Sequence, residues 1–126
     1  MYGYKKQVNT SFDEAVSKAR DELKKEGFGI LTEIDVKATL KKKLDVDYDS
    51  YIILGACNPP FAHKALKAEK DIGLLLPCNV VVYEGNGKVF VSAILPTVAM
   101  AMVDNPGLKE IAKDVEAKLK KVIDNI

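Results

Sequence analysis

The spacing of hydrophobic and polar positions predicts most of the secondary structure before any other feature is considered. Residues 2–8 alternate loosely and are rich in aromatic and β-branched side chains near their ends, which favours a first strand. Residues 12–26 repeat apolar positions at the 3.6-residue period of a helix. Ser11 and Glu14 form a capping box at the start of this helix, and Gly27 suits the left-handed conformation just beyond its end.

A second strand is predicted at residues 28–36, where alternation places Glu33 and Asp35 on one face. The opposite face takes Ile30, Thr32 and Ile34. The lysine-rich segment 37–44 predicts one or two helical turns. Residues 49–57 end in a continuous apolar run, which indicates a strand that is buried on both faces or covered by a helix at one end.

The next helix begins after Cys57. Asn58 is predicted to cap it, because an asparagine side chain accepts hydrogen bonds from free backbone amides, and Pro59 suits the first helical position. The inner side of this helix is expected to carry Phe61, Ala62, Ala65 and Leu66.

The clearest local pattern is a hairpin at residues 78–95. Two β-rich runs are joined by "EGNGK", whose Gly and Asn residues can adopt the positive φ angles of a tight turn. Pro96 then stops the strand, residues 97–103 suit a short helix, and a closing helix starts at Pro106, capped by Asp104 or Asn105.

This order predicts an α+β fold in a single domain, residues 1–126. A single, mostly antiparallel sheet should be covered on one face by helices, in the order β-α-β4-α with an extra helix between the central strands. The second face of the sheet also carries apolar side chains from "VVVY" and "VFVSAIL". Since an exposed apolar face is typical of a subunit interface, we expect a homodimer that forms through this outer sheet face.

Composition narrows the classes of function. The chain has 126 residues, 48% of them hydrophobic and 29% charged, with a net charge of +1. A near-neutral chain has no general electrostatic reason to bind nucleic acid or an anionic membrane, so we expect neither partner. The N-terminal residues have no apolar segment behind their lysines, which argues against a signal peptide and favours a cytoplasmic protein with free thiols.

The candidate chemistry lies in "GACNPPFAHKAL" and "LLPCNVVVY". If the strand that ends at Cys57 pairs with the one that begins at Cys78, both thiols lie at the same end of the sheet, beside the helix that carries His63. A cysteine near a helix N-terminus can have a lowered pKa and act as a nucleophile or redox centre. Asn58 and Asn79, together with His63, are candidates for binding a ligand.

Other interpretations of these residues stay open. Free cysteine often packs as a small hydrophobic residue, so structural thiols are favoured over reactive ones. A Cys-Cys-His set for a soft metal is disfavoured, because a closed zinc site takes four ligands and usually a closely spaced cysteine pair. No cofactor motif is present, and the glycines of "EGNGK" lack the spacing of a phosphate-binding loop.

Three segments together resemble one known family. "SFDEAVSKARDELKKEGFGILTEIDVKATLKKKL", "ILGACNPPFAHKAL" and "IGLLLPCNVVVYE" are similar to the domain of unknown function 302, found in small bacterial and archaeal proteins. The resemblance implies a fold like one half of the TATA-binding protein and a dimer, but no activity. Its signature falls here on Cys57, Asn58, Pro59, Cys78 and Asn79, accompanied by His63.

The sequence therefore favours a protein of unassigned activity that binds a small molecule or a partner near the Cys-Asn-Pro helix. One alternative is a thiol-dependent redox protein or enzyme, with Cys57 as thiolate, Cys78 as second thiol and His63 as proton donor. Another is a purely structural interaction module. No cofactor or metal site is predicted.

Overall fold

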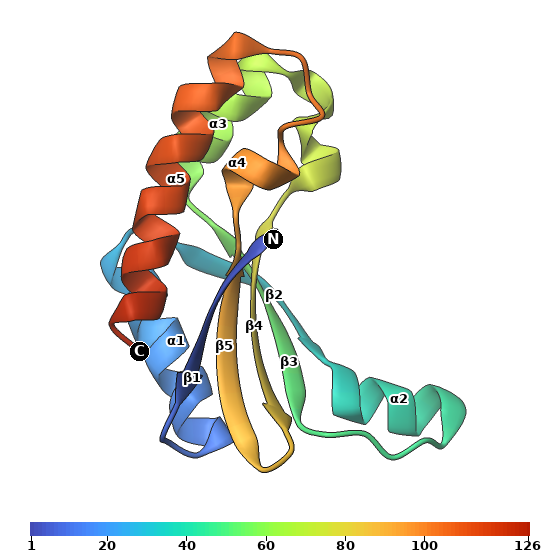
Figure 1. The fold of residues 1–126 in the computed structure, drawn as a ribbon. Coiled ribbons are helices and arrows are strands. Elements are labelled where there is room, and N and C mark those ends of the chain that lie inside the picture. The colour runs from blue at the N-terminus through green and yellow to red at the C-terminus, as the bar shows by residue number, and fades with distance from the viewer.

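A computed structural model describes all 126 residues and contains one antiparallel sheet with the strand order β1-β5-β4-β3-β2 (Figure 1). The strands are β1 (Gly3–Val8), β2 (Gly29–Asp35), β3 (Tyr51–Cys57), β4 (Cys78–Gly85) and β5 (Lys88–Ile94). The helices are α1 (Phe12–Lys25), α2 (Val36–Leu44), α3 (Pro59–Ala68), α4 (Pro96–Ala99) and α5 (Pro106–Asp124), with a 3₁₀ helix η1 (Lys70–Leu75) after α3. The predicted α+β fold and its order of elements are confirmed.

Most predicted turns and caps form as the local sequence requires. The Ser11 side chain accepts a hydrogen bond from the Glu14 amide at 3.1 Å, which starts α1. Asn105 accepts from an amide of the first turn of α5 at 3.0 Å. The β4–β5 turn places Asn86 at φ 53° and Gly87 at φ 74°, as a tight hairpin needs. The two caps set the starts of α1 and α5, and the turn sets the register between β4 and β5.

The hydrophobic core lies between one face of the sheet and helices α1 and α5 (Figure 1). On the central strands this inner face is formed by Leu54, Ala56, Cys78, Val80, Val82, Val89, Val91 and Ala93. Helix α1 adds Ala15, Ala19 and Leu23, and α5 adds Val115, Leu119, Val122 and Ile123. The strict two-residue alternation along β4 and β5 leaves the other side chains of these strands on the outer face.

Strand β2 departs from the predicted alternation, because its register with β3 shifts between Ile30 and Thr32. The predicted common face of Ile30 with Thr32 and Ile34 is therefore wrong. Ile30 pairs with the inner-face residue Ala56 and packs against the core, whereas Thr32 lies opposite Gly55 on the outer face. A bulge of this kind adds one residue to a strand and moves every later side chain to the opposite face.

The outer face of the sheet is not covered by α1 or α5 (Figure 1). Near the β4–β5 turn this face carries a row of stacked rings, in which the Tyr51 and Tyr83 centroids lie 5.2 Å apart and those of Tyr83 and Phe90 lie 5.4 Å apart. The Lys5 ammonium lies 5.1 Å from the Phe90 centroid. Helix α2 projects beyond β2 and β3 and has no buried residue.

Candidate functional site

A cavity of about 270 Å³ lies at the end of the sheet where β3 stops and β4 starts. Fourteen of its seventeen lining residues are hydrophobic, and none of the seventeen carries a charged side chain. Helix α3 contributes Phe61, Ala62, Ala65 and Leu66, and α5 contributes Ile111, Ala112 and Val115. The remaining apolar wall is formed by Phe28, Leu31, Ala56, Leu76, Pro77, Pro96 and Met100. Such a space suits an apolar molecule better than an ion.

Both cysteines line this cavity. Ala56 of β3 lies directly opposite Cys78 of β4, and Cys57 follows Ala56 as the last residue of β3. The two cysteines therefore lie at the same end of the sheet. Cys57 is half-buried and Cys78 is buried, and both are free thiols. Burial, and secondarily the neighbouring Cys57, raises the pKa of the Cys78 thiol to about 11. Cys78 therefore stays protonated at neutral pH, where a nucleophile would have to be a thiolate.

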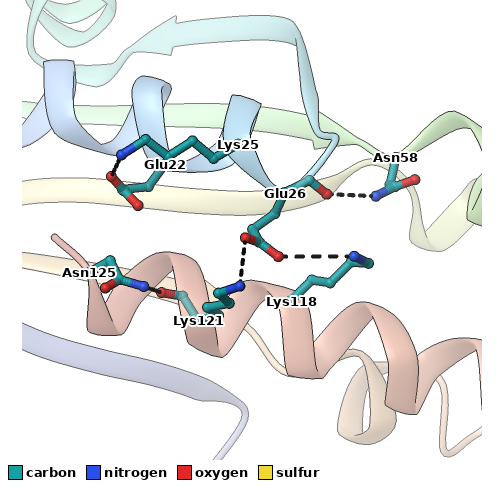
Figure 2. A network of polar contacts seen from close by, with 7 residues as sticks. All are labelled: Glu22, Lys25, Glu26, Asn58, Lys118, Lys121 and Asn125. Atoms are coloured by element: carbon teal, nitrogen blue, oxygen red, sulfur yellow. Dashed lines mark hydrogen bonds and ion pairs between the residues drawn. The ribbon is translucent and has the colours of Figure 1, made fainter.

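Asn58 also lines the cavity, but it does not cap α3 with its side chain as predicted. Its amide nitrogen Nδ2 instead donates a hydrogen bond to the backbone carbonyl of Glu26 at 3.1 Å (Figure 2). The residue is only 9% exposed, and it is positioned by the left-handed Gly27, at which an added Cβ would approach Nδ2 to 3.3 Å. The competing partner, an acceptor at the end of α1, explains why the local capping rule fails here.

Glu26 extends this connection to α5 (Figure 2). Its carboxylate oxygens lie 4.0 Å from Lys118 Nζ and 3.3 Å from Lys121 Nζ. The start of α3 is thus joined through the end of α1 to the helix that forms the opposite wall of the cavity. These contacts hold the two walls in a fixed relation.

The other two candidate residues lie outside this cavity. Asn79 follows Cys78 by one residue, so the strand places it on the outer face, where it is exposed and opposite Gly55. It borders a neighbouring hollow of about 220 Å³ that also includes Cys78. His63 is exposed on α3 and does not line the cavity. The structure therefore brings together Cys57, Asn58 and Cys78 and separates them from Asn79 and His63.

The carboxylates of β2 have other contacts. Glu33 forms an ion pair with Arg20 of α1, and the Asp35 side chain accepts a hydrogen bond from the Ala38 amide at 2.9 Å, which caps α2.

No group of three or more His, Cys, Asp or Glu side chains is arranged to hold a metal ion. No helix of the chain has both the length and the apolar character needed to cross a bilayer.

Sequence reasoning missed the contribution of α5 and of the segment before β4. Ile111, Ala112 and Val115 lie on the apolar side of α5, which the helical period alone assigns to the core. Their part in the cavity depends on how far α3 stands from α5, and no local pattern encodes that separation.

Comparison with known proteins places the whole arrangement in one family. The family model described as "Domain of unknown function DUF302" matches residues 4–126. The chain belongs to the DUF302 family. The crystal structure of the uncharacterized conserved protein DUF302 from Bacillus stearothermophilus is similar to this DUF302 protein, with 36% identity, coverage of 99% of this chain and 98% of that chain, and a TM-score of 0.93. No curated protein matches the sequence.

Proposed function

We propose that this DUF302 protein binds a compact apolar small molecule in the cavity between α3 and α5. The observation that carries this proposal is the uncharged, largely hydrophobic lining of a space of about 270 Å³. An engineered apolar cavity of about 150 Å³ is enough to bind benzene. The space here is larger, although it opens to solvent beside Leu31 and Leu66, which are 67% and 43% exposed, and it has room for a substituted ring or a short branched chain.

The thiols fit a binding role better than the alternative of a thiol-dependent enzyme. A resolving or attacking cysteine must ionise readily, and the raised pKa of Cys78 opposes this at neutral pH. The proton donor proposed for such chemistry, His63, does not line the same cavity. As protonated, weakly polar groups, the thiols of Cys57 and Cys78 would instead contribute soft contacts to an apolar ligand. Free thiols also accord with the cytoplasmic location that we propose.

The test of binding uses a variant that fills the cavity. Ala62→Phe places a ring in the cavity, and Ala117→Phe adds the same ring on the exposed side of α5 as a matched control. Indole and toluene are titrated into each protein while amide chemical shifts are followed. The wild type and the control should show saturable shifts around the cavity, and Ala62→Phe should not. Absence of saturable binding to the wild type would reject the proposal.

We also propose that the protein is a homodimer that associates through the outer sheet face. The support is the row of half-buried aromatic side chains from Tyr51 to Phe90, on the sheet face away from α1 and α5. A two-fold interface uses the same patch on both subunits, and aromatic side chains are enriched in such interfaces.

Charge introduced at the centre of this face tests the dimer. Val81 lies opposite Ile53 and Ser92 on the two neighbouring strands, so Val81→Glu places a carboxylate in the middle of the outer face. Analytical ultracentrifugation at micromolar concentration should show a dimer for the wild type and for the surface control Ala117→Glu. It should show a monomer for Val81→Glu. A monomeric wild type would contradict the proposal.

A further inference from the structure

Helix α2 lacks the packing that ordinarily stabilises a short helix. It has nine residues, and none of them is buried. Isolated helices shorter than about 12–15 residues are marginal in water, and helices in proteins gain most of their stability by burying an apolar face. Figure 1 shows α2 projecting beyond β2 and β3, the two strands that it contacts. A contact outside the chain would supply the packing that this helix lacks.

The segment that follows α2 combines exposed apolar side chains with carboxylates. Residues 44–49 read Leu-Asp-Val-Asp-Tyr-Asp, and the three apolar side chains are between 45% and 66% exposed. The first two carboxylates pair with a lysine of α2, whereas Asp49 forms no ion pair. The Tyr48 ring lies 6.5 Å from that of Tyr51, the first ring of the aromatic row on the outer sheet face. We call residues 36–49, which comprise α2 and this segment, the arm.

A hollow of about 650 Å³ on the outer sheet face has the complementary character. Seven of its eleven lining residues are hydrophobic, none is acidic, and Lys5 of β1 is the only basic one. Lys5 forms no ion pair within the chain, and its ammonium donates a hydrogen bond to Tyr83 Oη at 3.1 Å. An apolar hollow with an unpaired cation matches a segment in which apolar side chains lie between carboxylates.

The arm of the same chain extends away from the cationic side of this hollow. Strand β1 forms one edge of the sheet and β2 forms the other, and α2 projects beyond the β2 edge (Figure 1). The arm therefore lies on the far side of the sheet from Lys5. In a two-fold dimer the second copy can supply the missing arm, and the contact then occurs twice.

We propose that the arm of each subunit docks in the outer-face hollow of a second copy of this chain. Val46 and Tyr48 would fill the apolar part of the hollow, and the carboxylates beside them would lie near Lys5. This inference rests on the proposed homodimer and deepens it, because it names the segment that each subunit contributes to the other.

Two charge reversals test whether the contact joins different copies. Lys5→Glu makes the hollow acidic, and Asp49→Lys makes the arm basic; both side chains are exposed. In sedimentation experiments each variant alone should dimerise about tenfold more weakly than the wild type, because every dimer contains the contact twice. An equimolar mixture of the two variants should recover the wild-type affinity, since each arm then meets a hollow of opposite charge. A charge interaction within one chain would not be recovered by mixing.

The apolar part of the contact has its own variant and control. Val46→Ser combined with Tyr48→Ser removes the two apolar side chains from the arm. Met102→Ser is the matched control, because Met102 is 77% exposed and borders neither the arm nor the hollow. The arm variant should raise the dissociation constant of the dimer at least about tenfold, and the control should leave it unchanged.

The outcomes separate this inference from the homodimer proposal. Arm variants that dimerise as tightly as the wild type, or a charge-reversed mixture no tighter than its components, would overturn the arm contact and leave the homodimer standing. A wild type that stays monomeric at micromolar concentration would overturn both.

Discussion

The buried thiol of Cys78 gives the sharpest quantitative prediction. Burial raises its pKa from 9.0 to about 11. Two pKa units lower the thiolate fraction at neutral pH about 100-fold, and they correspond to about 3 kcal/mol of differential interaction between the two protonation states. Alkylating reagents attack the thiolate, but a more basic thiolate is also a stronger nucleophile, which offsets about tenfold of this loss. Folded Cys78 should therefore react at least about tenfold more slowly than the same thiol in the unfolded chain.

The Cys57→Ser variant leaves Cys78 as the only thiol, so its alkylation by iodoacetamide can be followed by mass spectrometry. The same variant in guanidinium chloride supplies the unfolded reference rate. Steric protection by the cavity wall would slow the reaction of the folded protein further, so about tenfold is a lower bound. Equal rates in the folded and unfolded protein would refute the argument from burial.

The same pKa shift makes stability depend on pH with a definite sign. The folded protein holds the Cys78 proton more tightly than the unfolded chain does. The resulting contribution to folding stability is therefore fully present below pH 9.0 and is lost as the pH rises to about 11. Tyrosine and lysine side chains titrate in the same range, so the relevant quantity is the difference between the wild type and Cys78→Ala. Urea unfolding should show that the wild type loses up to about 3 kcal/mol more than the variant across this window.

Two substitutions elsewhere test packing and capping. Gly55→Ala should destabilise the fold by about 1–3 kcal/mol, because the added Cβ would collide with Thr32 Oγ1 and lie 2.9 Å from the ring carbon Cγ of Pro77. The control Gly73→Ala has no atom within 4 Å of the added Cβ and should change stability little. Equal effects of the two substitutions in urea unfolding would reject this explanation. Asn105→Ala removes the cap of α5 together with the hydrogen bonds from Asn105 Nδ2 to the Ala68 carbonyl and the Glu69 carboxylate, and it should lower the thermal midpoint with a loss of at least about 1–2 kcal/mol. An unchanged midpoint would show that this side chain does not stabilise the start of the helix.

Much of the fold follows from local sequence, because each element has its own start and stop signals. The hairpin at Asn86 and Gly87 and the capping box at Ser11 form where the residues predict them, since both depend on interactions within a few residues. The bulge in β2 could not be foreseen. The bulge arises from the pairing of Ile30 and Thr32 with β3, which lies more than about twenty residues further along the chain. The alternation of apolar and polar residues within β2 itself does not show where the extra residue lies.

Only part of the candidate site could be predicted from the sequence. The pairing of β3 with β4 brings Cys57 and Cys78 to one edge, as the strand pattern suggested. Asn79 and His63 are near these residues in sequence but are directed elsewhere, Asn79 by the alternation of β4 and His63 by its position on α3. Proximity in sequence therefore identified the region of the site, while strand and helix geometry determined its members.

The start of α3 shows how a distant partner can override a local rule. An asparagine followed by two prolines should cap the helix with its side chain, yet Asn58 Nδ2 donates to the Glu26 carbonyl at the end of α1. Asn58 is 9% exposed and lines the cavity, so this bond ties the start of one cavity wall to the end of α1. Because the cap and the longer-range bond compete for one side chain, the position of this wall follows from a tertiary contact rather than from the capping pattern.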